Sequence, residues 1–222
     1  MAIRFVFKQS MRMVLLAAMF CQGYAQPLKG QMSVGAADHR NVVYRGGMVS
    51  PPLPKPKFTL TDTSGVHFDF ATKTEGYLTL LFFGFTNCPD MCPMQMHMIA
   101  QALKKIAPAA GNQIKVVFVT TDPARDSPKV LRAYLDHFDK NFIGLTGDAA
   151  AIDAAQIAAN LSPAKKSPTR ADGTYDVGHA AFVIAYTKDN LAHVLYPVGV
   201  KEEDLAHDLP YLANETWMRP AP

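Results

Sequence analysis

The sequence predicts an α/β fold in which helices cover both faces of a mixed β-sheet. Apolar runs with the composition of buried strands alternate along the chain with segments in which apolar residues recur at helical spacing. The chain has 222 residues, 49% of them hydrophobic, which is enough for one domain with a substantial core and a terminal extension.

A β-hairpin opens the predicted domain. Residues 58–62 alternate between apolar and polar side chains, Ser64 and Gly65 favour a turn, and residues 66–68 return as the second strand. His67 in this second strand is expected to face outward rather than to bind a ligand, because the alternation places it on the polar side.

The next two strands are predicted to lie in the middle of the sheet. Residues 77–85 form a long apolar run rich in aromatic side chains, and residues 113–122 contain a second apolar run. A helix follows each strand. Pro93 suits the first turn of one helix, and Ser127 with Pro128 begins the other, which extends to residue 138.

The second half of the chain continues this alternation of strands and helices. A short strand (142–145), an alanine-rich helix (148–161) and a polar loop (162–173) come first. A hairpin (174–187 and 191–196) and a closing helix (202–213) follow. Strand–helix units followed by a hairpin and a helix are the order of a thioredoxin-like fold.

A pair of cysteines lies where the first buried strand gives way to its helix. Cys88 in the loop and Cys92 in the first helical turn can point at a common spot. A helix N-terminus stabilises a thiolate and lowers its pKa, and ligands bind at the carboxyl ends of strands in open α/β sheets. The pair can close a disulfide or bind a soft metal such as Cu(I) or zinc. Two inert buried cysteines, or a purely structural bridge, are the alternative.

Asp122 and three methionines are further candidates near the cysteine pair. Asp122 ends the second buried strand, where its carboxylate either approaches the cysteines or hydrogen-bonds the backbone of its own turn. Met91, Met94 and Met98 share one face of the predicted helix. They form either an entry track for Cu(I) or gap-filling core residues, while Met96 points elsewhere.

Three segments of the chain match the motifs of one family in the right order. They are residues 84–93 (GFTNCPDMCP), residues 121–128 (TDPARDSP) and the hairpin of residues 179–197. These segments resemble the Sco/SenC copper chaperones, and the resemblance covers roughly residues 52–213. It implies a thioredoxin-like fold, copper binding, and delivery of the copper to the binuclear copper site of cytochrome c oxidase.

His179 completes the predicted site. The thioredoxin-like plan places the loop before the strand at residue 180 opposite the cysteine pair, where redox thioredoxins keep a proline. No proline occurs between Thr169 and Tyr196, and the ligand histidine of the Sco/SenC family stands in the place of His179. That family often has an acidic residue directly before its histidine. Here Gly178 takes that position, and Asp176 lies two residues further back.

We therefore expect a copper chaperone that binds one copper ion through Cys88, Cys92 and His179. Cu(I) accepts a few soft donors, whereas Cu(II) also takes the imidazole nitrogen. The expected recipient is the copper-site subunit of cytochrome c oxidase, as the resemblance implies, or another exported copper protein. Two alternatives stay open: a thiol-disulfide reductase that acts on the recipient's cysteines, with Cys88 as the outer thiol, and a copper or redox sensor.

The first 25 residues have the pattern of a secretory signal peptide. A basic start that ends at Arg12 precedes a short apolar core at residues 13–20, and Gly23 and Ala25 suit cleavage before Gln26. The core is shorter than the ~20 residues that span a bilayer, so we expect a soluble periplasmic protein without a membrane span. A retained membrane anchor that faces the periplasm is the alternative. Cleavage would leave only the close cysteine pair, which is expected as a disulfide unless reduced or metallated.

The remaining chain divides into three parts. Residues 26–51 are predicted to be a flexible linker with glycine and proline, residues 52–214 the copper-binding domain, and residues 215–222 a tail. The domain is expected to be a monomer.

The charge of the chain argues against nucleic acid as a partner. Its net charge of +3 equals the contribution of Arg4, Lys8 and Arg12 in the predicted signal peptide, so the mature chain would be neutral. The basic residues of the 162–173 loop, Lys165, Lys166 and Arg170, either dock an acidic partner or are simply solvated.

Overall fold

A computed structural model describes residues 42–215 and 217. The predicted signal peptide and most of the predicted linker lie outside the described residues. The strands are β1 (Gly47–Pro54), β2 (Thr59–Asp62), β3 (His67–Asp69), β4 (Leu78–Gly84), β5 (Ile114–Thr120), β6 (Ile143–Thr146), β7 (Lys165–Lys166), β8 (Val177–Gly178), β9 (Val183–Tyr186) and β10 (Leu191–Tyr196). The α-helices are α1 (Phe70–Lys73), α2 (Met91–Ala110), α3 (Pro128–Asp136), α4 (Ala149–Ala158) and α5 (Glu202–Asn214).

The central sheet has the strand order β1-β10-β9-β4-β5-β6-β2-β3. β4, β5 and β6 run parallel to one another, and β9 joins β4 in the antiparallel sense. β2 and β3 form the predicted opening hairpin at one edge, and β1 pairs with β10 at the other. Parallel strands direct their carboxyl ends to the same edge of the sheet, so the loops after β4 and β5 lie next to each other.

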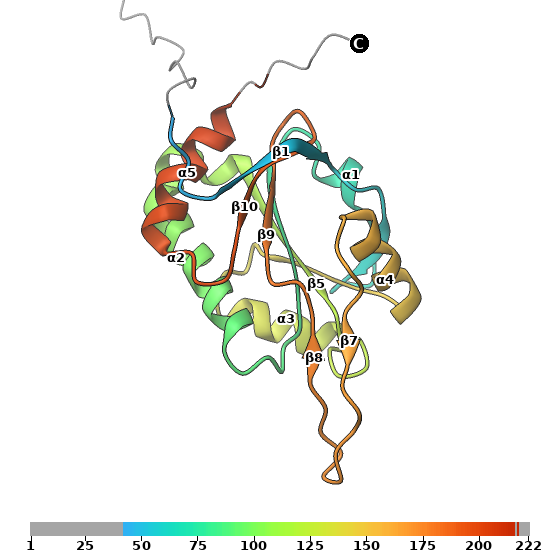
Figure 1. Cartoon of the computed structure of the whole chain (residues 1–222). Coiled ribbons are helices and arrows are strands. Elements are labelled where there is room, and N and C mark those ends of the chain that lie inside the picture. The colour runs from blue at the N-terminus through green and yellow to red at the C-terminus, as the bar shows by residue number, and fades with distance from the viewer. Residues whose placement is uncertain (1–41, 216, 218–222) are drawn as a thin grey trace, which may run out of the picture. The chain divides into compact units, whose positions relative to one another are not determined.

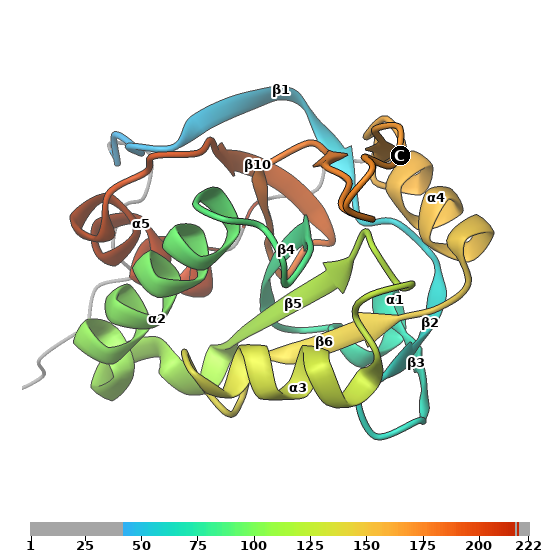
Figure 2. The same cartoon turned by 90° about the horizontal axis from the view of Figure 1, so that it is seen from below.

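Two cores form, one on each face of the sheet, because successive residues of a strand point to opposite sides. Leu78, Leu80 and Phe82 of β4 pack with α2, α3 and α5, whereas Leu81 and Phe83 pack with α1 and α4. Figures 1 and 2 show α2 and α5 on one side of the sheet and α4 on the other. The predicted α/β class, with helices on both faces, is confirmed.

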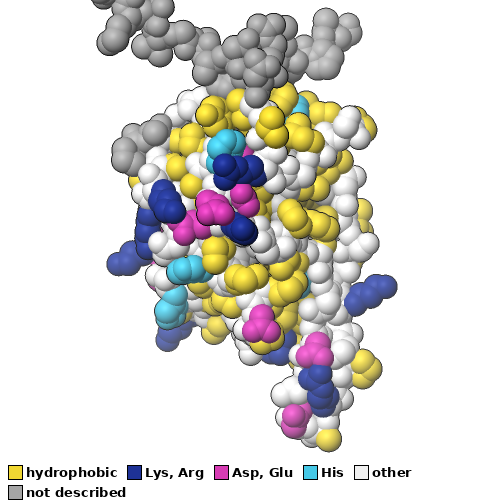
Figure 3. Space-filling view, turned by 60° about the vertical axis from the view of Figure 1, so that its left-hand side comes forward, with side chains coloured by type: hydrophobic (Ala, Val, Ile, Leu, Met, Phe, Trp, Pro, Cys, Tyr) yellow, Lys and Arg dark blue, Asp and Glu magenta, His cyan; other side chains and the backbone are white. Residues whose placement is uncertain are grey.

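The face formed by α2 and α5 carries charges of both signs. Lys105 of α2 pairs with Glu202 at the start of α5 at 2.6 Å, and Arg45 pairs with Asp204 at 3.4 Å. In the space-filling view, basic and acidic side chains lie beside one another among apolar ones on this face (Figure 3). The charges there are therefore balanced locally rather than gathered into a patch of one sign.

Strand β1 differs from the sequence-based expectation, because it begins inside the range assigned to the linker. Its prolines are compatible with a strand at the edge of the sheet, where one side of the backbone needs no partner. The residue just before it, Gly46, lies so close to β10 that a Cβ would be 2.4 Å from Val194 and 2.7 Å from Tyr196. Both features depend on β10, which lies far away in the sequence.

Both ends of the predicted 162–187 region also differ. The polar loop contains β7, which pairs with β8 in a small separate sheet, and the predicted strand 174–187 is interrupted between β8 and β9. The resulting β7–β8 hairpin (residues 165–178) projects beyond the central sheet (Figure 1).

Two residues of the predicted C-terminal tail contact the domain. The carboxylate of Glu215 accepts a hydrogen bond from the hydroxyl of Tyr44, and the ring of Trp217 stacks on that of His193.

Candidate metal centre

The two cysteines lie in the connection between β4 and α2. Cys88 is half-buried in the loop, and Cys92 is fully buried in the first turn of the helix. The backbone N–H of Cys92 donates to Sγ of Cys88 over 3.4 Å, and the two sulfur atoms are not joined. One cysteine is thus reachable from solvent while the other is enclosed by the core.

Gly84, the last residue of β4, makes room for the inner sulfur. A Cβ at this position would lie 3.0 Å from Sγ of Cys92, 2.7 Å from the ring of Phe82 and 3.1 Å from the ring of Phe118. The sulfur can therefore rest against the end of the strand only because residue 84 has no side chain.

His179 reaches the cysteines from the segment between β8 and β9. Its Nε2 lies 3.5 Å from Sγ of Cys92, and its Nδ1 lies 3.1 Å from the backbone oxygen of Ala180. A carbonyl oxygen can only accept, so we assign the proton to Nδ1, which leaves the lone pair of Nε2 directed at the sulfur. The rings of Phe82 and Phe85 stand edge-on to the imidazole, 6.1 and 5.6 Å away between centroids.

The three side chains named from the sequence come together. The sulfur atoms of Cys88 and Cys92 and a ring nitrogen of His179 all lie within 4.8 Å of one another. No other group of three or more cysteine, histidine or carboxylate side chains with this proximity occurs in the described part of the chain. Two soft sulfurs and one imidazole nitrogen are a donor set that suits copper and excludes hard cations such as Mg²⁺ or Ca²⁺.

Burial favours the neutral forms of Cys92 and His179. Burial raises the pKa of the Cys92 thiol well above its ordinary value, and the nearby Cys88 raises it further. This direction is opposite to the lowering expected from the helix N-terminus. Burial also lowers the pKa of His179, so the imidazole is neutral near pH 7 and has a lone pair to donate. A metal ion that binds here must displace the proton of the Cys92 thiol, whereas neutral His179 can coordinate the ion without losing a proton.

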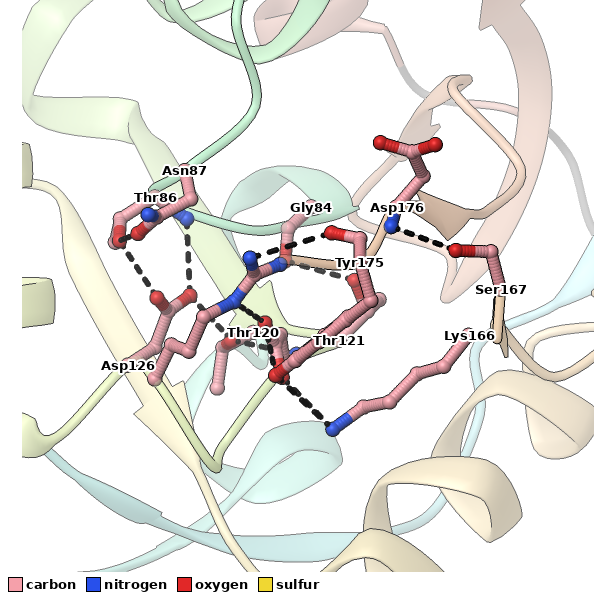
Figure 4. A network of polar contacts seen from close by, with 12 residues as sticks. Gly84, Thr86, Asn87, Thr120, Thr121, Asp126, Lys166, Ser167, Tyr175 and Asp176 are labelled. Carbon is pink, nitrogen blue, oxygen red and sulfur yellow. Dashed lines mark hydrogen bonds and ion pairs between the residues drawn. The ribbon is translucent and has the colours of Figure 1, made fainter. Parts of the chain in front are cut away.

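Asp126, which the sequence reasoning did not single out, holds the cysteine loop in place. Its carboxylate accepts from the N–H of Thr86 at 2.9 Å, the hydroxyl of Thr86 at 2.6 Å and the hydroxyl of Thr120 at 2.6 Å (Figure 4). It also contributes to the raised pKa of Cys92. The only signal in the sequence was its place in the motif of residues 121–128.

The carboxylate of Asp122 contacts side chains rather than the backbone of its own turn. Its fully buried carboxylate is not part of the cysteine–histidine group and instead contacts the side chains of Arg125, Lys166 and Tyr175. Lys166 forms an ion pair with the buried Asp122, and Arg170 forms an ion pair with the exposed Asp176. The docking role suggested for the basic loop residues stays a prediction, with Lys166 and Arg170 already paired to carboxylates of this chain.

The methionines divide as their helical spacing predicts. Met96 is fully buried in the core, whereas Met91 and Met94 are exposed and Met98 is half-buried.

None of the α-helices in the described ranges has the length and apolarity needed to cross a membrane.

Comparison with known proteins assigns the chain to one family. The family model described as SCO1/SenC matches residues 49–214, so the chain belongs to the SCO1/SenC family. An SCO2-like protein of Rickettsia prowazekii is 30% identical over 181 residues, which cover 80% of each chain.

Solved structures agree with this assignment. The structure of ScoI from Bradyrhizobium japonicum with copper bound is 31% identical, with a TM-score of 0.64 over 72% of this chain and 99% of that one. The solution structure of apo Sco1 from Thermus thermophilus is also 31% identical, with a TM-score of 0.67 over 78% and 97% of the two chains. The thioredoxin-like fold expected from the sequence is confirmed.

Proposed function

We propose that the protein is a copper chaperone that holds one copper ion through Cys88, Cys92 and His179 and passes it to a copper protein. The observation that carries this proposal is the convergence of two sulfurs and one ring nitrogen within 4.8 Å. Membership of the SCO1/SenC family supports it, as does a relative of the same fold that was solved with copper bound.

The three ligands would have different roles in binding and releasing copper. Two thiolates are enough for Cu(I), and the imidazole adds the harder donor that Cu(II) requires. Buried Cys92 anchors the ion, while half-exposed Cys88 is the ligand that a partner can replace first. Each thiol gives up its proton when copper binds, so binding strengthens as the pH rises.

The recipient and the compartment are parts of the same proposal. Relatives of the chain include the mitochondrial SCO1 of Saccharomyces cerevisiae, and one solved structure of similar fold is that of a member of the Sco family of cytochrome c oxidase assembly proteins. We propose the copper-site subunit of cytochrome c oxidase as the recipient. Delivery would take place in the periplasm after cleavage of residues 1–25, by a monomeric domain that includes β1. The linker would then run from Gln26 to the segment that leads into β1.

Anaerobic titration of the reduced protein with Cu(I) tests the binding site. One equivalent should bind tightly, and Cys88→Ser and Cys92→Ser should each abolish tight binding, because a single thiolate cannot replace two. His67→Ala, which removes an exposed histidine from β3, serves as the control and should bind as the parent does. Native affinity in either serine variant contradicts the proposed site.

A thiol-disulfide reductase is the second candidate, and the unequal exposure of the two cysteines favours it. Cys88 as thiolate would attack the partner's disulfide, and Cys92 would then attack the mixed disulfide. The partner leaves as a dithiol, and its two electrons and two protons come from the Cys88 and Cys92 thiols, which end as a disulfide.

Cells that carry His179→Ala separate the two functions. A carrier predicts reduced oxidase activity that added copper partly restores, since His179 is a metal ligand but not part of the disulfide. A reductase predicts a change in thiol exchange rate without dependence on copper. Full oxidase activity at limiting copper in this variant would favour the reductase.

A further inference from the structure

We propose that Asp122 is a positioning residue for His179: its carboxylate clamps both strands of the β7–β8 hairpin to the end of β5 and thereby sets where the imidazole lies relative to the cysteines. This inference rests on the proposed function, because it concerns the copper ligand that arrives from the hairpin.

The position of His179 depends on where the hairpin is held. His179 directly follows Gly178, the last residue of β8, and the small sheet pairs Lys165 with Gly178 and Lys166 with Val177. The hairpin projects away from the central sheet, so contacts at its base determine its direction (Figure 1). A shift of that base would carry the imidazole with it.

Asp122 contacts both strands of the hairpin at that base. Nζ of Lys166, in β7, lies 2.9 Å from one carboxylate oxygen of Asp122. The hydroxyl of Tyr175, two residues before β8, lies 2.9 and 3.1 Å from its two oxygens. The side chains of Lys166 and Tyr175 also meet each other, with 3.4 Å between Nζ and the hydroxyl (Figure 4). The carboxylate therefore joins the two strands to each other and to the core domain.

The clamp is built on a rigid support. Asp122 is completely buried just after β5, and its N–H donates to the hydroxyl of Thr120 over 3.0 Å. Burial alone would raise its pKa, but Lys166, Arg125 and Tyr175 hold that pKa below its ordinary value. The carboxylate is thus ionised near neutral pH and can serve as a fixed anionic anchor.

Arg125 provides a second connection from the clamp to the imidazole. Its guanidinium pairs with Asp122, stacks 3.9 Å above the ring of Tyr175 and donates to the backbone oxygen of Tyr175 at 3.3 Å. It also lies 5.7 Å above the ring of Phe85, whose edge-on contact with His179 was described above. The histidine is therefore held from the hairpin side and from the side of its aromatic neighbour.

The two acids of the segment 121–128 thus serve different halves of the site. Asp126 holds the cysteine loop through Thr86, and Asp122 holds the histidine hairpin. Loss of Asp122 should consequently disturb the nitrogen ligand and leave the two sulfurs in place. This separation can be measured, because Cu(II) needs the imidazole and Cu(I) can stay with the thiolates.

The test compares Asp122→Asn and Lys166→Met in the reduced full chain. Both should weaken Cu(II) binding, Asp122→Asn by about tenfold or more, as expected when a residue that orients a ligand is lost. The nitrogen hyperfine signal in the electron paramagnetic resonance spectrum of Cu(II) should weaken in parallel, while Cu(I) affinity stays near that of the parent. Lys166→Arg, which keeps the charge, should restore Cu(II) binding relative to Lys166→Met.

A measurement without metal separates this inference from the proposed function. Amide hydrogen exchange in residues 165–180 should accelerate in Asp122→Asn and Lys166→Met and should stay slow in the control Asp176→Asn. That control removes an exposed carboxylate from the same hairpin. Unchanged exchange in Lys166→Met overturns the clamp, even if Asp122→Asn fails to fold. Faster exchange with unchanged Cu(II) affinity and spectrum overturns the positioning role. Absence of copper binding in the parent would contradict the proposed function and leave the exchange result to decide on the clamp.

Discussion

Gly84 is the single residue on which the position of the inner sulfur depends most directly. The clash that a Cβ would cause is with Sγ of Cys92 and with two aromatic rings of the core, none of which can move freely. Residue 84 must be glycine because no space is left for a Cβ. Residue 84 lies within a regular strand whose seven residues are all buried.

We predict that Gly84→Ala weakens copper binding and destabilises the fold by about 1–3 kcal/mol, the usual cost of overpacking a core. Gly111→Ala is the matched control, because its Cβ would meet only Ala107 at 3.6 Å and its backbone is already helical. That change should be neutral or stabilising by up to about 1 kcal/mol. Urea unfolding and copper competition measure both effects. A Gly84→Ala variant with parental copper affinity would show that the sulfur position is not critical.

Lys55 is a second residue whose environment has a measurable consequence. Its side chain is buried, and Nζ donates to the backbone oxygen of Thr74 at 3.1 Å. Burial lowers its pKa from 10.5 to about 8. Between these two values the unfolded chain binds more protons than the folded one, so this group makes folding more favourable as the pH rises.

We therefore predict that the stability of the parent rises relative to that of Lys55→Met between pH 8 and pH 10. Below pH 8 the difference should be constant, because Lys55 is then protonated in both states. Lys57→Met removes an exposed lysine two residues away and serves as the control for the loss of one positive charge. Urea unfolding across this pH range measures the difference. A flat difference for Lys55→Met would mean that the buried amine keeps its ordinary pKa.

At the scale of elements, α5 anchors the segment that leads into β1. Asp208 of α5 is completely buried and accepts from the N–H groups of Arg45 and Gly46, each at 3.0 Å. It also accepts from the hydroxyl of Tyr196 in β10 at 3.1 Å and from Nδ1 of His207 at 2.8 Å. One carboxylate thus joins a helix, a strand and the entry to the edge strand.

We predict that Asp208→Ala lowers the free energy of unfolding by about 3 kcal/mol, because several buried donors lose their acceptor. Asp204→Ala, one turn earlier on the same helix, removes only a surface pair with Arg45 and should change stability by less than about 1 kcal/mol. Urea denaturation of both variants provides the comparison. Equal effects would contradict the anchoring role of Asp208.

The elements that the sequence predicted well are those with a strong local pattern. β4 and β5 are apolar throughout, and α3 begins at Ser127, whose side chain caps the helix by accepting from the N–H of Val130. β1 was not predicted because its strand character depends on pairing with β10, more than a hundred residues away. The break between β8 and β9 was missed for a related reason, since β8 pairs with β7 and β9 with the central sheet.

The same distinction applies to the site. Cys88 and Cys92 were named from their spacing and their place in the fold, and His179 also from the resemblance to the Sco/SenC family. The structure brings the three side chains together. The roles of Asp122 and Asp126 were not predicted, because they depend on contacts such as the one between Thr86 and Asp126, forty residues apart. No local pattern carries that information.

At the scale of the whole described domain, the sheet assembles one candidate metal-binding group from two distant parts of the chain. The β4–α2 connection brings two sulfurs, and the segment after the β7–β8 hairpin brings the nitrogen, 87 residues beyond Cys92. The central claim is that all three atoms bind the same copper ion.

X-ray absorption spectroscopy at the copper edge tests that claim most directly. The Cu(II)-loaded parent should show two sulfur ligands and at least one imidazole nitrogen. His179→Ala should lose the imidazole contribution and bind Cu(II) far more weakly, while its Cu(I) form keeps both sulfurs. His67→Ala is the control and should reproduce the parent spectrum. An imidazole contribution that persists unchanged in His179→Ala, or a parent spectrum with fewer than two sulfurs, would contradict the three-ligand site.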